Sequence, residues 1–206
     1  MESAVVKGSG GSATKLQGRD FILIAVFGVL FFVVMLAFSL VFGMSAHTMW
    51  FTHSVGAIPS GIIWMYLFSR VPKRGAIFIM GVLIGLLGFL MGMFWTGPLG
   101  IVVGSIIGEL IMGIGGKRTP TKLIIAFAAF VLCFWIGQIS LIYLAGQSYV
   151  DMVVGSGMSL EYAQQLVDFV YGPLVFVAFC TTIIGSLIGG FLGKKLFKKH
   201  FEKIVS

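Results

Sequence analysis

Six apolar runs, separated by short polar segments, are the feature that most restricts how this chain can fold. They cover residues 21–43, 54–69, 75–95, 98–116, 123–146 and 173–193. A helix needs about 20 apolar residues to cross a bilayer core of about 30 Å. The run at 54–69 is short for this, so we expect its helix to start earlier or the segment before it to dip into the membrane face. The pattern predicts an all-α membrane protein with six transmembrane helices.

Composition supports one compact membrane domain. The chain has 206 residues, of which 58% are hydrophobic and 10% charged, whereas soluble domains carry about 25% charged residues. Residues 1–19 are polar and rich in glycine and serine, so we predict a disordered cytoplasmic segment there and a six-span domain over residues 20–206. The net charge of +7 is confined to clusters beside the apolar runs, which predicts a bilayer as the partner and no nucleic acid.

The basic residues predict which side each end of the chain occupies. All of them lie before the first run, in alternate connecting segments, or after the last run: Lys7, Lys15, Arg19, Arg70, Lys73, Arg74, Lys117, Arg118, Lys122, Lys194, Lys195, Lys198, Lys199 and Lys203. Cytoplasmic loops of membrane proteins carry an excess of lysine and arginine. Six spans with both termini cytoplasmic satisfy every one of these positions.

The segment 147–172 is then an extracytoplasmic cap. It holds three of the seven acidic residues, Asp151, Glu161 and Asp168, and has no Lys or Arg. Ser159 is suited to the N-cap of a short helix with Glu161 in its first turn. That helix would carry one apolar stripe, formed by Leu160, Ala163, Leu166, Val167 and Val170. It would either cover a pocket or shield the bundle at the interface.

Glycines recur along one face of three of the runs. The repeats are Gly81, Gly85, Gly88 and Gly92; Gly100, Gly104 and Gly108; and Gly185, Gly189 and Gly193. Glycine on one helix face lets two backbones approach closely in a membrane. We therefore predict that these three helices pack tightly against their neighbours.

The sequence offers no catalytic apparatus. It has no phosphate-binding loop and no HExxH cluster, and none of its three histidines lies within an apolar run. We expect a protein that is not an enzyme and that needs no cofactor or metal. Glu109 is the one clear acid inside a run; it would pair with a basic residue or a partner, or line a proton path.

Aromatic and amide side chains gather at the outer ends of the runs. The candidate substrate-binding residues are Trp50, Trp95, Gln138, Tyr143, Asp168 and Tyr171. Apolar walls with a few orienting polar groups are typical of small-molecule pockets. An aromatic belt at the membrane interface would place Trp and Tyr at the same depth, but a belt does not require the amide of Gln138.

Three segments carry a resemblance to a known family. They are DFILIAVFGVLFFVVM at 20–35, GMSLEYA at 157–163 and GGFLGKKLFKKHFEK at 189–203. With six spans and cytoplasmic termini, they resemble the S components of energy-coupling factor (ECF) transporters, in particular the Trep_Strep group with its MptD-family members. The resemblance covers most of the chain after Arg19.

The resemblance implies a substrate-binding subunit of an importer in the bacterial plasma membrane. Such a subunit captures a vitamin or similar micronutrient and docks a T component and two ATPases. In the family the docking face is an AxxxA pattern on the first span, which here corresponds to Ala25 and Val29 with Gly28 beside them. Two alternatives remain open from the residues: a stand-alone secondary carrier using Glu109, and a structural membrane protein that binds no ligand.

Overall fold

The computed structural model describes residues 15–115 and 118–198, and it is helical throughout. In chain order the helices are α1 (Gly18–Phe42), α2 (Ala46–Met49), α3 (Thr52–Arg70), α4 (Ala76–Leu90), α5 (Thr96–Gly113), α6 (Pro120–Ala145), α7 (Gln147–Gly155), α8 (Leu160–Tyr171) and α9 (Leu174–Leu196). Within the described ranges there is no strand, so the prediction of an all-α chain is confirmed.

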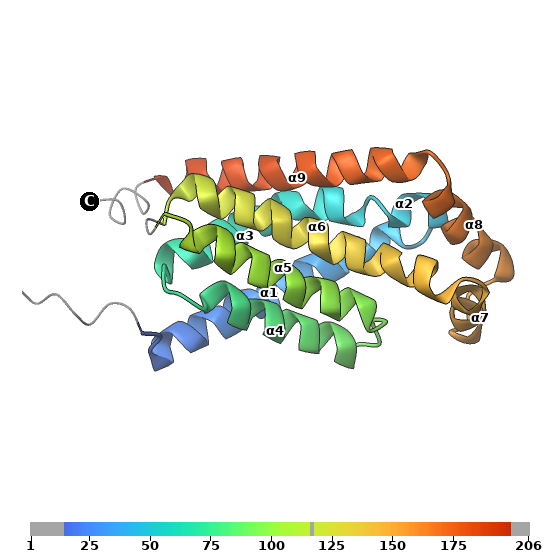
Figure 1. Ribbon diagram of the computed structural model, residues 1–206, viewed down its shortest axis with the longest axis horizontal. Helices are drawn as coiled ribbons and strands as arrows, with labels where there is room; N and C mark the ends of the chain where they lie inside the picture. Colours follow the sequence, from blue (N-terminus) through green and yellow to red (C-terminus); the bar gives the residue numbers. More distant parts are fainter. Residues whose placement is uncertain (1–14, 116–117, 199–206) are drawn as a thin grey trace, which may run out of the picture.

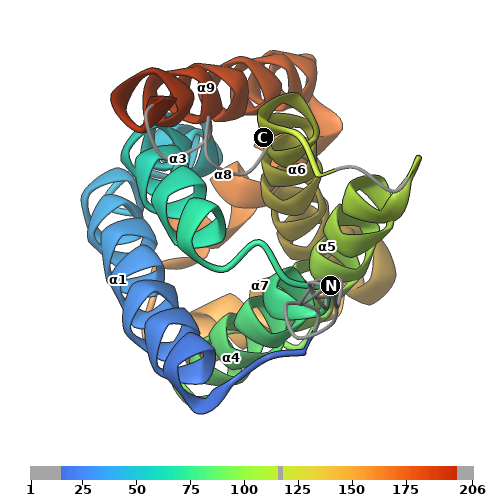
Figure 2. The same cartoon turned by 90° about the vertical axis from the view of Figure 1, so that its left-hand side faces the viewer.

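The long helices run along one axis and alternate in direction (Figure 1). Viewed from the end, α1, α3, α9, α6, α5 and α4 form a closed ring in which each helix contacts the next (Figure 2). The short helices α2, α7 and α8 gather at one end, which we call the cap end (Figure 1). The other end, where α1 begins and α9 ends, carries all the lysines and arginines of the described ranges, and we call it the basic end.

Four helices are long and apolar enough to cross a membrane: α1, α5, α6 and α9. Helix α4 has 15 residues, or a rise of about 22 Å, and is shorter than the apolar run at 75–95. It stops at Leu90 because Gly92 adopts a left-handed conformation (φ 87°) and the Met93 N–H donates to the Gly88 carbonyl at 2.9 Å, a glycine-based helix end. Helix α3 spans 19 residues but includes several serines, which lower its mean hydropathy.

Three of the long helices begin a few residues before the apolar runs that predicted them, and in α6 a polar cap sets the start. Helix α6 begins at Pro120, because the Thr119 hydroxyl accepts a hydrogen bond from the Lys122 N–H at 3.3 Å. Helix α5 begins at Thr96, two residues before the apolar run at 98–116. Helix α3 begins at Thr52, two residues before the apolar run at 54–69, as expected for an earlier start.

Glycine faces hold the ring together, as predicted. On α9, a Cβ at Gly185 or Gly189 would clash with the carbonyl oxygens of Ser54 or Ala57 on α3. On α5, a Cβ at Gly100 would lie 2.9 Å from the Gly137 Cα on α6. These pairs of helices therefore touch backbone to backbone, and no side chain separates them.

An aromatic core fills the half of the bundle nearer the basic end. Trp64 is fully buried, and its ring centroid lies 5.0 Å from that of Phe130 and 5.4 Å from that of Phe127. Phe31 on α1 meets Phe130 edge to face at 5.8 Å. The Trp64 indole N–H donates to the Leu123 carbonyl at 3.2 Å, so this half of the interior is closed, and the larger cavities lie toward the cap end.

Candidate functional site

A cavity of about 350 Å³ lies beneath the cap. Its walls come from the end of α2, the α4–α5 loop, the start of α5, the cap-end third of α6, and α7 and α8 with the loop between them. The residues that line it are Met49, Trp50, Gly92, Met93, Phe94, Thr96, Gly97, Gln138, Leu141, Tyr149, Val153, Ser156, Met158, Tyr162 and Leu166. Its volume is within the range of small-molecule sites, about 300–1,000 Å³, and its walls are mainly apolar.

Gln138 supplies the polar group at the inner side of this cavity. It lies on α6, four residues beyond the buried Phe134, and its amide makes no hydrogen bond to any residue of the described ranges. An added Cβ at Gly97 would lie 2.7 Å from the Met93 Sδ, so glycine there leaves room for the methionine in the same wall. A free amide presents both a donor and an acceptor to whatever occupies the cavity.

Two further polar atoms in the wall have no hydrogen-bond partner among the described residues. They are the indole nitrogen of Trp50 and the hydroxyl of Thr96, in side chains that are 2% and 3% exposed. The Trp50 position is itself fixed, because its carbonyl accepts from the Trp135 indole at 3.0 Å. A buried unpaired donor costs about 1–3 kcal/mol, which marks this wall as shaped for something other than the protein's own stability.

The cap is anchored at three places around the cavity. The Tyr162 hydroxyl donates to the Gly43 carbonyl, just past α1, at 2.7 Å. The Phe169 ring stacks on Trp50 with centroids 6.4 Å apart, and the Tyr143 hydroxyl donates to the Val170 carbonyl at 3.2 Å. The cap therefore forms a fitted cover for the cavity.

The predicted cap helix is confirmed in its start and in most of its apolar stripe. The Ser159 hydroxyl accepts from the Tyr162 N–H at 3.1 Å, and Ala163, Leu166 and Val170 are buried. Leu160 is 54% exposed, so the stripe begins one turn later than expected. The sequence analysis did not anticipate α7, although its buried residues Tyr149, Val150 and Val153 have helical spacing.

The structure brings together two of the six predicted site residues, Trp50 and Gln138, in this cavity. Trp95 lies on a separate surface hollow beside Leu99 and is 55% exposed. Asp168 is exposed on α8. Tyr143 and Tyr171 pack edge to face with centroids 5.3 Å apart, outside the cavity. The sequence therefore predicted the end of the bundle at which these residues lie, but the structure places them on its surface and not in the cavity.

Tyr149, Tyr162 and Met93 line the cavity and were not predicted as site residues. The helical spacing of Tyr149 with Val153 was a usable signal for one of them. Met93 follows the left-handed Gly92. The sequence alone does not show how the chain turns at that glycine, so it could not indicate that Met93 lines the cavity. The sequence placed Tyr162 on the predicted cap helix, but it did not show where that helix lies relative to α1.

Tyr149 is expected to lower the folding stability of the protein at alkaline pH. Burial raises the pKa of its phenol to about 12, from an ordinary value of 10.0. Between these values the unfolded chain ionises and the folded chain does not, so stability falls as the pH rises through this window. We expect Tyr149→Phe to flatten the loss of thermal stability between about pH 10 and about pH 12, measured by circular dichroism. Tyr171→Phe, which changes an exposed tyrosine, is the control; an unchanged slope in Tyr149→Phe contradicts the prediction.

The three predicted docking residues do not share one surface. Ala25 and Val29 are exposed on α1. Gly28 is buried, and a Cβ there would lie 3.0 Å from the Leu83 side chain of α4. The expectation of one small-residue patch is thus incorrect for Gly28, because α4 of the same chain already covers it.

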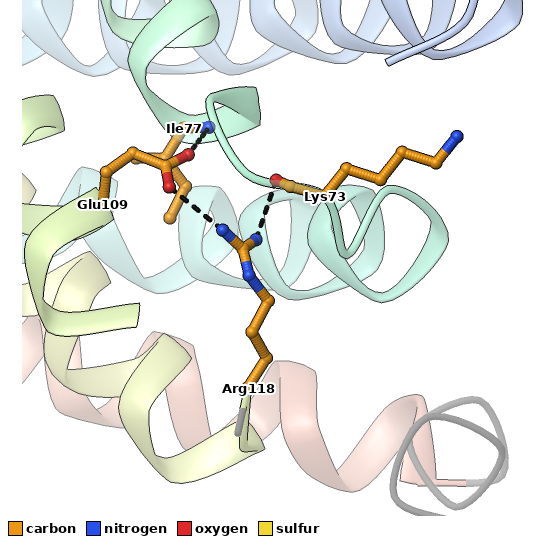
Figure 3. Close-up of polar contacts among 4 residues, drawn as sticks. All are labelled: Lys73, Ile77, Glu109 and Arg118. Carbon is orange, nitrogen blue, oxygen red and sulfur yellow. Dashed lines mark hydrogen bonds and ion pairs between the residues drawn. The ribbon is translucent and has the colours of Figure 1, made fainter. Parts of the chain in front are cut away.

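Glu109 lies outside the cavity, in a polar network at the basic end (Figure 3). Its carboxylate pairs with the Arg118 guanidinium at 3.0 Å and accepts from the Ile77 N–H at 2.9 Å. Arg118 also donates to the Lys73 carbonyl at 2.8 Å. Ile77 is the second residue of α4, whose own N-cap, Gly75, has no side chain to offer, so Glu109 takes the place of a helix cap.

The network continues to α1 through Asp20. The Lys73 ammonium pairs with the Asp20 carboxylate at 2.7 Å, and the same carboxylate oxygen accepts from the Gln17 N–H. The start of α1, the α3–α4 loop and the end of α5 are thereby tied together.

Within the described ranges, no group of three His, Cys, Asp or Glu side chains is placed to hold a metal ion.

Comparison with known proteins agrees with a helical membrane chain of bacterial type. The model of one family, described as a hypothetical bacterial integral membrane protein, matches residues 18–203. The chain belongs to this family, Trep_Strep, and is a multi-pass membrane protein of bacteria. No curated protein and no solved structure matches the chain.

Proposed function

We propose that the chain is the substrate-binding S subunit of an ATP-driven, ECF-type importer of a small-molecule micronutrient. The subunit itself catalyses nothing; a T component and two ATPase subunits drive transport. The observation that carries the proposal is the cavity beneath the cap, with a Gln138 amide that has no hydrogen-bond partner among the described residues, at the end of the bundle opposite the basic residues.

The charge distribution gives this cavity a direction. All six long helices cross the membrane in the proposal, the shorter α3 and α4 included. The positive-inside rule then puts the basic end, and both termini, in the cytoplasm. The cavity faces the outside, where a high-affinity subunit captures its substrate. Ala25 and Val29, which are exposed on α1, are the proposed contacts with the T component.

The two alternatives have less support. A secondary carrier would use Glu109 as its coupling acid, but Glu109 is engaged by Arg118 and Ile77 and does not line the cavity. A purely structural protein has no need for a cavity whose wall holds a Gln138 amide and a Trp50 indole that have no hydrogen-bond partner among the described residues.

Purification from native membranes under mild detergent tests the proposal. We expect a tagged chain to recover a T-type membrane subunit with two ATPases. Ala25→Trp and Val29→Trp should reduce their recovery, because both enlarge the exposed face of α1. Ile188→Trp, on the exposed face of α9, is the matched control. Recovery of this chain alone, together with uptake that needs no ATP, would overturn the proposal.

A further inference from the structure

A second cavity, of about 250 Å³, adjoins the first. The two share Met49, Gly92, Met93 and Gln138 in their linings. The second lies between α1, α4 and α6, and Phe31, Phe32, Leu36 and Phe134 contribute to its walls. The Gln138 side chain therefore lies where the chamber under the cap, whose mainly apolar walls carry several hydroxyl groups, meets a second chamber inside the ring.

The apolar chamber reaches the side of the bundle between α1 and α4. These helices meet closely where Gly28 faces Met80 and Leu83. Nearer the cap end, the second cavity occupies the space between them, and its lining includes the exposed residues Ser39 and Met91. Leu36, which also lines this cavity, lies six residues before the end of α1, or about 9 Å along the helix, so this part of the lining is at the depth of lipid chains in the proposed orientation.

The two cavity linings differ in the number of polar side chains, but neither contains a charged side chain. The chamber under the cap offers Gln138, Thr96, Ser156 and two tyrosines, whereas the chamber between α1 and α4 adds only the hydroxyls of Ser39 and Thr52 to the shared Gln138 and is otherwise aliphatic and aromatic. Neither lining contains an Asp, Glu, Lys, Arg or His. A charged ligand would lose its hydration without gaining a partner here, which is costly.

We infer that the ligand is an uncharged amphiphile, with a polar, flat head under the cap at Gln138 and an apolar tail in the chamber between α1 and α4. The tail enters sideways from the outer leaflet of the membrane, so the ligand need not pass through the cap. This inference rests on the proposed function for the capture of a substrate, and it adds the class of substrate and its route.

A photoreactive neutral amphiphile tests the inference on the full chain in lipid nanodiscs. The probe is para-octylbenzamide with a diazirine at the end of its tail, and the labelled residues are identified by mass spectrometry. We expect labelling of the α1 and α4 residues that line the second cavity, suppressed by an excess of tail-less benzamide. The charged analogue para-octylbenzoate should give much less.

Two pairs of variants locate the tail and the head. Leu36→Trp fills the second cavity and should abolish labelling, whereas Leu40→Trp, one turn further along α1 and 68% exposed, should not. Gln138→Ala should weaken labelling, and Ser140→Ala, which lies outside both cavities, is its control. Labelling that is absent from the wild type, or equal in Leu36→Trp and unaffected by benzamide, would overturn the inference. Recovery of the ATPases is measured independently, so a failure here leaves the importer proposal standing.

Discussion

Gly185→Leu is expected to leave almost no correctly folded protein. A Cβ at this position would clash with the carbonyl oxygen of Ser54, and the three nearest atoms all belong to the Ser54 backbone. Helix α3 cannot retreat without losing the hydrogen bond between Ser54 and Thr182, which is 3.1 Å long. Overpacking usually costs about 1–3 kcal/mol, and a clash with backbone at a helix crossing should exceed that range.

The measurement is the yield of monodisperse protein in size-exclusion chromatography, followed by thermal unfolding in detergent. Gly113→Leu is the matched control, because nothing lies within 4 Å of a Cβ at the end of α5. Gly185→Ala should lose stability by a smaller amount. Normal yield and unfolding of Gly185→Leu would show that α3 and α9 do not pack as described.

The second large effect is expected for Glu109→Leu. The substitution leaves the Ile77 N–H and one arm of Arg118 without the partners that they have at 2.9 and 3.0 Å. Breaking a buried ion pair costs about 3–5 kcal/mol, and the partial exposure of both side chains, 15% and 17%, places the effect near the lower limit. Glu109→Gln should cost less, since its amide oxygen still accepts from Ile77.

Unfolding of the purified variants in a graded denaturing detergent gives the comparison. The double variant Glu109→Leu with Arg118→Leu should lose less than the sum of the single changes, which defines the coupling between the two side chains. Glu161→Leu, in an exposed residue of α8, controls for the loss of one negative charge. A full loss of transport with unchanged stability in Glu109→Gln would instead support the carrier alternative.

The number and order of the long helices were predictable because each is long, apolar and bounded by polar residues. The glycine repeats also predicted contact correctly: Gly185 and Gly189 do meet another backbone. They could not identify the partner helix, because a glycine face allows close contact with any neighbouring helix. The pairing of α9 with α3 joins residues 127 positions apart, and no local pattern encodes it.

The site was only partly predictable for a related reason. Gln138 was identified because an amide inside an apolar run needs an explanation, and the structure gives it a place in the cavity wall. Tyr143 and Tyr171 lie at the same cap end as Gln138, but their side chains are exposed on the surface. The rotation of each helix about its axis decides between these outcomes, and in apolar helices the difference between the lipid face and the inner face is too small to read from hydrophobicity.

The pairing of α3 with α9 has a consequence for biosynthesis. Helix α3 is among the first to leave the ribosome, and it buries Ser54 and Ser60 in the bundle, yet its closest partner is the last described helix. At about 5–20 residues per second, the growing chain waits for several seconds or more before α9 arrives. During this interval α3 packs on α1, or on the insertion machinery, without the Thr181 and Thr182 partners that the Ser54 hydroxyl has in the folded protein. The assembly of this protein is therefore expected to depend on the insertion machinery holding α3 until α9 has been made.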